Sequence, residues 1–173
     1  MVLAENQPEL RSLMMACVLC NDSVLQKEQG EWVILGDPTE GSLLAVAGKA
    51  GLRRDEQANK FPRVGEFPFS SERKRMSVIV QNPEHGQSSW EMFTKGSPEL
   101  TLERCTRVQG DLHPQELTPE LRHRILEENN LLASQGLRVL GFAQKALNEL
   151  PSESSEDQSE QGLTWLGLVG MLD

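Results

Sequence analysis

The positions of three prolines constrain the fold of this chain more than any other feature. Each follows a residue that can cap a helix, in the pairs Asp37-Pro38, Ser97-Pro98 and Thr118-Pro119. A polar capping side chain followed by proline in the first helical position is typical of a helix start. The pairs therefore predict helices over about 37–51, after 97, and from 118 to about 136. In the first of these, Glu40 stands where the acid of a capping box belongs.

The remaining apolar segments predict a mixed structure. Leu10, Met14 and Cys17 recur at helical spacing, so we expect a further helix over about 8–20. Apolar runs bounded by turn residues predict strands over 32–35, 61–67, 76–80, 89–94, 137–146 and 163–169. The sequence Asn-Pro-Glu-His-Gly at 82–86 supplies a turn between two of these strands.

Length and composition are those of one soluble globular domain. The 173 residues can bury a core, and 38% are hydrophobic while 25% are charged. No apolar run approaches the ~20 residues that cross a bilayer, and no secretory signal is visible. A net charge of -9 argues against general binding to nucleic acid or anionic lipid. We expect a monomer that neither binds nucleic acid nor enters a membrane.

Cys17 and Cys20 form a C-x-x-C motif that has more than one interpretation. A zinc site needs a second pair of ligands, which Cys105 alone does not supply. A redox motif would follow a strand, whereas this pair lies in an expected helix. We favour two small core residues, in a chain whose three cysteines indicate a reducing compartment.

One segment has no apolar residue and a high negative charge. Its sequence is Pro-Ser-Glu-Ser-Ser-Glu-Asp-Gln-Ser-Glu at 151–160. Burial cannot offset the entropy lost in ordering such a segment, so we predict a mobile, solvated loop over 151–162. A regulatory role for this loop is the alternative.

The chain gathers positive charge beside one aromatic side chain, in Phe69-Ser-Ser-Glu-Arg-Lys-Arg-Met-Ser-Val78. A nucleotide offers both a flat ring and an anionic tail. Phe69 is expected to stack on a base, an interaction worth ~1–3 kcal/mol, while Arg73 and Arg75 strengthen the local field. The alternative is that Phe69 belongs to the core and that the cations form a solvated face.

The register of two expected strands decides whether the cations converge. If the strands pair antiparallel with Val80 opposite Ser89, then Lys74 lies opposite Lys95. Like charges that face each other destabilise a sheet by ~0.2–1 kcal/mol. An anion between the two lysines would relieve this repulsion, so we expect an anion site there.

Familiar catalytic motifs are absent from the sequence. Gly36-Asp-Pro-Thr-Glu-Gly-Ser42 has the glycine spacing of a phosphate loop but lacks its lysine. No nucleophile motif lies near His85, His113 or His123. We therefore expect surface histidines, no metal site and no catalytic residue within the chain.

Six motifs in one order carry a specific resemblance. They are Cys20-Asn-Asp-Ser23, Gly36-Asp-Pro-Thr-Glu40, Phe69-Ser-Ser-Glu-Arg-Lys-Arg-Met-Ser77, Lys95-Gly-Ser-Pro-Glu99, Leu137-Arg138 and Leu166-Gly-Leu-Val-Gly-Met-Leu-Asp173. Together they resemble the nucleotide-binding domain of a P-type cation-transporting ATPase, in particular the type II branch with the calcium pumps. The resemblance implies an α+β fold with helices flanking an antiparallel sheet, and makes 1–173 a single domain excised from a larger pump.

The resemblance also implies a nucleotide site. Phe69 matches the family's stacking aromatic, Lys74 matches a lysine at the nucleotide, and Lys95 matches the lysine that lines the adenine pocket. Gly96 would let the backbone approach the ligand closely. The other matched residues are Glu40 and neighbouring Thr39 on the adenine side, Arg138 at the phosphates and Leu140 as an apolar wall, with Asp37 near the edge.

Two positions depart from the family's pattern. Ser71 stands where calcium pumps often carry an arginine, so phosphate binding would be weaker or would come from Arg73. Ser97 replaces an alanine, which would improve a helix cap.

The resemblance implies that the chain binds ATP without turning it over. The family's phosphorylated aspartate lies in D-K-T-G-T, which this sequence lacks. We expect the chain to hold ATP, as Mg-ATP in the intact pump, and to deliver it to the phosphorylation domain, with the actuator domain as a further partner. It would then be a cytoplasmic domain of an integral membrane cation pump, with calcium suggested as the ion only by the branch.

Two other functions stay open. The chain could be an interaction or regulatory module that has lost nucleotide binding and docks through its acidic loop. It could also be a stand-alone phosphatase or kinase, which the missing nucleophile motif disfavours.

Overall fold

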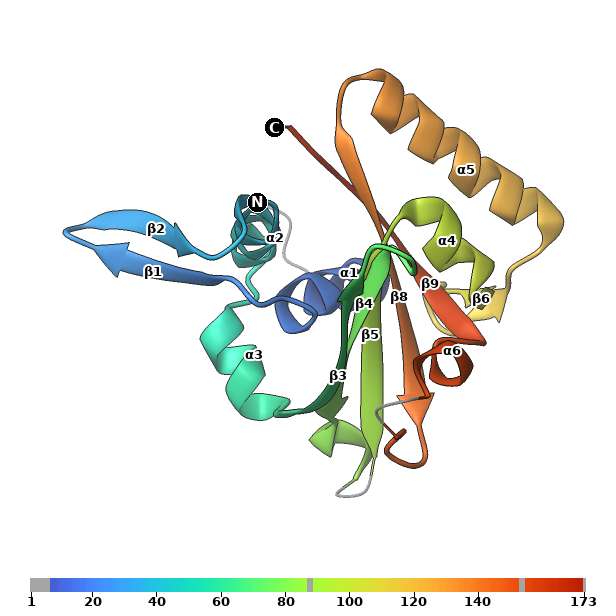
Figure 1. Ribbon diagram of the computed structural model, residues 1–173, viewed down its shortest axis with the longest axis horizontal. Coiled ribbons are helices and arrows are strands. Elements are labelled where there is room, and N and C mark those ends of the chain that lie inside the picture. The colour runs from blue at the N-terminus through green and yellow to red at the C-terminus, as the bar shows by residue number, and fades with distance from the viewer. Residues whose placement is uncertain (1–6, 87–88, 153–154, 173) are drawn as a thin grey trace.

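A seven-stranded sheet forms the centre of the protein, with helices on both faces and a two-stranded hairpin standing apart (Figure 1). The structure is a computed structural model that describes residues 7–86, 89–152 and 155–172. The strands are β1 (Val24–Glu28), β2 (Glu31–Leu35), β3 (Arg63–Ser70), β4 (Arg75–Gln81), β5 (Trp90–Gly96), β6 (Cys105–Val108), β7 (Gln115–Glu116), β8 (Arg138–Leu147) and β9 (Leu163–Met171). The helices are α1 (Pro8–Leu19), α2 (Pro38–Lys49), α3 (Arg54–Lys60), α4 (Pro98–Glu103), α5 (Pro119–Ser134) and α6 (Glu156–Ser159), with a 3₁₀ turn, η2 (Pro83–His85).

The sheet has the strand order β3-β4-β5-β8-β9-β6-β7. Its described neighbours pair antiparallel apart from β6 and β9, which run parallel. The expected fold class, α+β with helices flanking an antiparallel sheet, is confirmed. In the described part of the chain, no helix is both long and apolar enough to cross a bilayer.

Each face of the sheet buries its own core, and the two-residue period of the strands divides the side chains between them. On β4, Met76 and Val78 join the cluster with α1 and α2, whereas Ile79 joins the cluster with α4 and α5. On β5, Phe93 and Met92 divide in the same way. Successive side chains of a strand point to opposite faces, so a sheet covered on both sides needs the continuous apolar runs that the sequence shows.

All three expected proline helix starts are confirmed, because α2, α4 and α5 begin at Pro38, Pro98 and Pro119. Asp37 caps α2 and accepts hydrogen bonds from the backbone amides of Thr39 at 2.8 Å and Glu40 at 3.2 Å. Thr118 caps α5 in the same manner.

Two capping expectations are wrong. Ser97 makes no side-chain cap and instead donates to the Glu99 carboxylate at 2.8 Å. Glu40 is not the acid of a capping box, since its carboxylate accepts from the amides of Asp22 and Ser23 on the loop after α1. Ser97 bonds to a near neighbour and Glu40 to amides of another segment, so neither side chain caps the helix start at which the local sequence predicts it.

The expected strands are present, but several short elements were not expected, namely α3, β1, β6, β7 and α6. The strand expected at 61–67 runs from Arg63 to Ser70, because α3 occupies the preceding residues up to Lys60 and the buried Phe61 follows it as the C-cap. No side chain of α3 is buried, so the helix carries no apolar period for a sequence to show.

The expected register between β4 and β5 is wrong by two residues. Val80 pairs with Glu91 rather than Ser89, and Met76 pairs with Lys95. The pair that closes the ladder before η2 is Gln81 with Trp90, one residue later on each strand than the expected pair of Val80 with Ser89. A shift of two leaves every side chain on its expected face, but Lys74 precedes the strand and does not face Lys95.

The C-x-x-C cysteines are core residues, as favoured from the sequence. Cys17 and Cys20 are fully buried free thiols, and Cys105 is buried as well. Burial raises the pKa of Cys17 to about 12 and that of Cys20 to about 11, so both stay protonated at neutral pH. Among the described residues, no group of His, Cys, Asp and Glu is arranged to hold a metal ion.

The acidic segment 151–162 is not uniformly solvated. Glu153 and Ser154 lie outside the described residues, but α6 follows them and Glu160 is 0% exposed. A carboxylate can be buried when cations meet it inside the protein, and Arg73 and Arg75 meet Glu160 in this way. The mobility of the segment stays a prediction.

Replacement of Asp37 by alanine tests the cap of α2. We expect Asp37→Ala to lower the free energy of unfolding by about 1 kcal/mol, because two backbone amides lose their acceptor. The melting temperature should fall by about 2–4 °C per kcal/mol in a chain of this size. Asp37→Asn, which can still cap, is the matched control. Equal losses in both variants would show that the capping bonds do not stabilise the helix.

Candidate functional site

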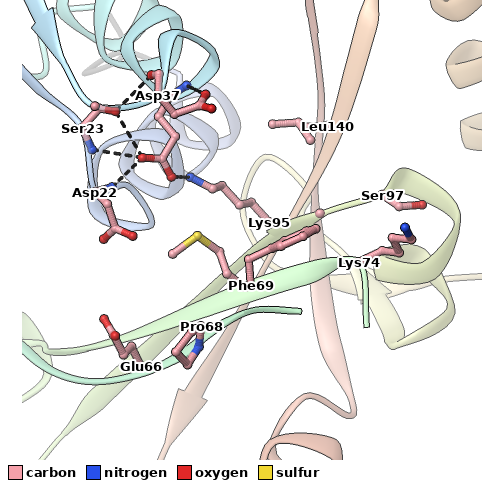
Figure 2. Close-up of a pocket in the computed structure, with 14 residues that line it drawn as sticks. Asp22, Ser23, Asp37, Glu66, Pro68, Phe69, Lys74, Lys95, Ser97 and Leu140 are labelled. Atoms are coloured by element: carbon pink, nitrogen blue, oxygen red, sulfur yellow. Dashed lines mark hydrogen bonds and ion pairs between the residues drawn. The ribbon is translucent and has the colours of Figure 1, made fainter. Parts of the chain in front are cut away.

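A pocket of about 590 Å³ opens where the loop after α1, the start of α2 and the ends of β3, β4 and β5 meet (Figure 2). This volume lies within the range of small-molecule sites. The pocket is lined by Asp22, Ser23, Gly36, Asp37, Glu40, Glu66, Pro68, Phe69, Lys74, Met76, Lys95, Gly96, Ser97 and Leu140.

Phe69 presents its ring to the pocket rather than to the core. It lies near the end of β3 and is 61% exposed. By contrast Phe67, two residues earlier, is buried in the core beneath α4 and α5. The alternative that Phe69 is a core residue is therefore wrong. An exposed aromatic ring on a pocket wall can stack on a flat ligand.

Lys95 lies deep in the pocket and is neutralised there. It is 6% exposed on β5, and its ammonium Nζ donates to Glu40 Oε1. The other Glu40 oxygen accepts from the amides of Asp22 at 2.9 Å and Ser23 at 3.0 Å, and from the Ser23 hydroxyl at 3.3 Å. The Glu40 carboxylate thus ties α2, the loop after α1 and the sheet together.

The other carboxylates of the pocket are also occupied. Arg63 binds both Asp22, at 2.7 Å, and Glu66, at 3.1 Å. Asp37 caps α2. The hydrogen bond from the backbone amide of Glu40 is the largest cause of the lowered pKa of the Asp37 carboxyl. The pocket therefore contains acids without presenting an open field of negative charge.

Lys74 is the second lysine that lines the pocket. It is exposed, and it forms no salt bridge with any residue in the part of the chain that the structure describes. In Figure 2 Lys95 extends toward Ser23 and Asp22, whereas Lys74 lies near Ser97. The two lysines do not converge on one point, which corrects the anion site expected between them.

Packing within the protein requires a glycine at position 96. A Cβ atom at Gly96 would clash with the carbonyl oxygen of Lys74 and lie 2.5 Å from the Cβ of Arg75. The glycine therefore lets β5 pass close to the turn before β4. We expected it to allow a ligand to approach, and the structure supplies this different reason.

The remaining predicted residues lie at the rim or on the wall. Arg138, at the start of β8, donates from Nη1 to the hydroxyl of Thr39 at 2.9 Å, and neither residue lines the pocket. Leu140 does line it and packs against the core beneath α1.

Arg73 and Arg75 do not contribute an open positive field. Both bind the buried carboxylate of Glu160, with bonds of 2.7 Å from Arg73 Nη1 and 2.6 Å from Arg75 Nε. Neither arginine lines the pocket. Arg73 thus donates to Glu160 outside the pocket lining, and its expected contact with the phosphates, in place of an arginine at position 71, stays a prediction.

Sequence reasoning gave no role to several lining residues. Asp22 and Ser23 belong to a motif that carried the resemblance, so a signal for them existed. Met76 lies in the motif at 69–77 and had the same signal, whereas Glu66 and Pro68, on β3, lie outside all six motifs.

The arrangement suits a flat ring joined to an anion. The ring of Phe69 offers a stacking surface, Met76 and Leu140 add apolar contact, and the deep Lys95 is neutral in sum with Glu40. The ammonium of Lys74 is exposed, so it can pair with a negative group while staying partly hydrated.

Comparisons with known proteins place this chain among cation-pump domains. The family described as P-type ATPase, cytoplasmic domain N, matches residues 9–173. A calcium-transporting ATPase of Lactococcus lactis is 40% identical over 96% of the chain, and one of Bacillus subtilis is 36% identical over 98%. A sodium/potassium exporting P-type ATPase of Schizosaccharomyces pombe is 34% identical over 97%. The chain spans only 18%, 18% and 16% of the length of these relatives.

Removal of one charge tests the pairing of Glu40 with Lys95. Glu40→Gln keeps the size of the side chain but leaves the buried ammonium without its counter-charge, so we expect a loss of ~3–5 kcal/mol in the free energy of unfolding. Urea unfolding measures this loss.

Glu66→Gln, at an exposed acid of the same pocket, serves as the matched control and should cost less than about 1 kcal/mol. The double variant Glu40→Gln/Lys95→Met should recover part of the stability, since no buried charge of this pair then remains without a partner. Equal stability of Glu40→Gln and the wild type would contradict the account of this pair.

Proposed function

The chain belongs to the family of P-type ATPase cytoplasmic N domains, and from that membership we propose that its pocket binds the adenine nucleotide ATP. The observation that carries the proposal is the exposed ring of Phe69 on the wall of a pocket of about 590 Å³. A phenylalanine that is 61% exposed gains little from folding. Its place is explained if a second ring covers it.

The two lysines take different parts in the proposed complex. The charge of Lys95 is paired with Glu40. Lys95 therefore lies next to the uncharged base in the proposed complex, together with the apolar side chains of Met76 and Leu140. Lys74 has no such partner among the described residues, so it suits the phosphates. Arg138 would reach the phosphates only if its guanidinium turned away from Thr39, which it now binds.

The role of the domain follows from the family and from the pocket together. We infer that it is one part of a cation-transporting ATPase and that it carries the γ-phosphate of ATP, as Mg-ATP, to an aspartate on the phosphorylation domain. Its contribution to catalysis is then orientation and charge stabilisation. The named relatives transport calcium or export sodium and potassium, so the ion of this pump is left open.

Removal of the Phe69 ring tests the stacking. We expect Phe69→Ala to raise the Kd for ATP roughly 5- to 150-fold, corresponding to the loss of about 1–3 kcal/mol of stacking. Titration calorimetry of the isolated chain measures the change. Trp32→Ala is the matched control, because Trp32 is an aromatic residue of similar exposure on the hairpin away from this pocket. Unchanged affinity in Phe69→Ala would exclude the proposed pose.

Comparison of ATP with adenosine tests the division between the lysines. Lys74→Ala should weaken ATP binding by about 3- to 10-fold, because an exposed ion pair with phosphate is removed, and should leave adenosine binding unchanged. The ATP effect should shrink as salt screens the charges. Lys49→Ala, at an exposed lysine on α2, is the control. Equal effects of Lys74→Ala on ATP and adenosine would place this lysine at the base instead.

A further inference from the structure

We propose that Glu160 is a positioning residue for the nucleotide pocket. Its buried carboxylate holds the turn between β3 and β4, which carries Phe69 on one side and Lys74 on the other. This inference rests on the proposed function, and it assigns a role to an acid of the segment 151–162 that lines no part of the pocket.

Glu160 is the buried centre of a polar network on the sheet. It is 0% exposed and accepts bonds at 2.7 and 2.8 Å from Arg73 Nη1, at 2.6 Å from Arg75 Nε and at 2.7 Å from the Ser77 hydroxyl. The Ser77 hydroxyl also bonds to that of Thr94 on β5, at 2.7 Å. Such a set satisfies the carboxylate and fixes its position.

The two arginines link the Glu160 carboxylate to the backbone of the turn through further hydrogen bonds. The second terminal nitrogen of Arg73 donates to the carbonyl of Pro68, the residue directly before Phe69. Arg75 Nη1 donates to the carbonyl of Arg73 at 3.0 Å, directly before Lys74. Glu160 therefore reaches the chain next to both proposed ligand-binding residues without touching the ligand.

The turn needs such restraint because its backbone is unfavourable. Lys74 has a φ of 54°, in the left-handed region that side chains other than glycine rarely adopt. The carbonyl of Lys74 accepts from the amide of Ser97 at 2.9 Å, which adds a second tie from the sheet. Loss of the Glu160 charge would leave this conformation with less support.

Among the described residues, no other acid can replace Glu160 without rearrangement. Arg75 is 2% exposed, and the only further carboxylate near it in that part of the chain is Asp157, at 3.6 Å, whose side chain is 75% exposed. Glu160→Gln would thus leave two guanidinium groups competing for one neutral amide. We expect the turn to shift, and with it the ring of Phe69 and the ammonium of Lys74.

The experiment compares ATP binding in wild type, Glu160→Gln and Glu160→Asp at a temperature where each is folded. We expect Glu160→Gln to raise the Kd for ATP by ~10-fold or more, as displaced ligand-binding groups do, and Glu160→Asp to retain most of the affinity because it keeps the charge. Amide chemical shifts of the unliganded protein should change over residues 68–75 in Glu160→Gln.

Glu91→Gln is the matched control for a merely structural effect. Glu91 lies on the same sheet, is partly buried with its pKa raised by this burial, and accepts a hydrogen bond from Asn82. Its substitution should leave the Kd within about twofold of the wild type, because it is remote from the turn. If Glu160→Gln does not fold, Arg73→Lys removes the fork that reaches Pro68 while keeping the positive charge, and should itself weaken ATP binding.

The outcomes separate the two proposals. If the wild type does not bind ATP, the proposed function fails and the role of Glu160 fails with it. If the wild type binds ATP and both Glu160→Gln and Arg73→Lys bind it equally well, only the positioning role is overturned. An equal loss of affinity in Glu91→Gln would also overturn it, since the effect would then be general destabilisation.

Discussion

The pairing of a fully buried carboxylate, Glu160, with Arg73 and Arg75 ties the turn that carries Phe69 and Lys74 to the segment before β9. Removal of these charges from water is costly, and the network compensates only because every oxygen of the carboxylate has a close donor. As a result the cluster of cations that stands out in the sequence is used inside the protein. Its positive charge holds a turn in place, and Lys74 is the member of the cluster that lines the pocket.

The same principle of internal neutralisation explains the other side of the pocket. Glu40 neutralises the charge of Lys95, and Arg63 pairs with both Asp22 and Glu66 and offsets one of their two negative charges. A chain with a net charge of -9 thereby builds a pocket that is neither strongly acidic nor strongly basic. Such a pocket can accept an uncharged base at its deep end, while an exposed ammonium at its open end meets an anionic tail. The site depends on where charges are cancelled as much as on where they are present.

Local patterns in the sequence were sufficient for the fold class and for most elements. The helix starts at Pro38, Pro98 and Pro119 and the apolar strands depend on neighbours within a few residues, so a single sequence shows them. Contacts between distant segments were not visible in this way. The register of β4 against β5 depends on how the connection folds, and the partner of Arg73 lies 87 residues away at Glu160. The motifs contain most of the residues that line the pocket, although the predicted Thr39 and Arg138 do not line it, and they did not show which charges are paired.

The most direct test of the account is the position of the adenine ring in solution. Nuclear Overhauser effects between the adenine protons of bound ATP and the ring protons of Phe69 measure it in the isolated chain. The account predicts strong effects to Phe69, with contacts to Leu140 or Met76 on the same wall. Saturation with ATP that gave no effect to the Phe69 ring, or effects only to residues outside this pocket, would contradict it.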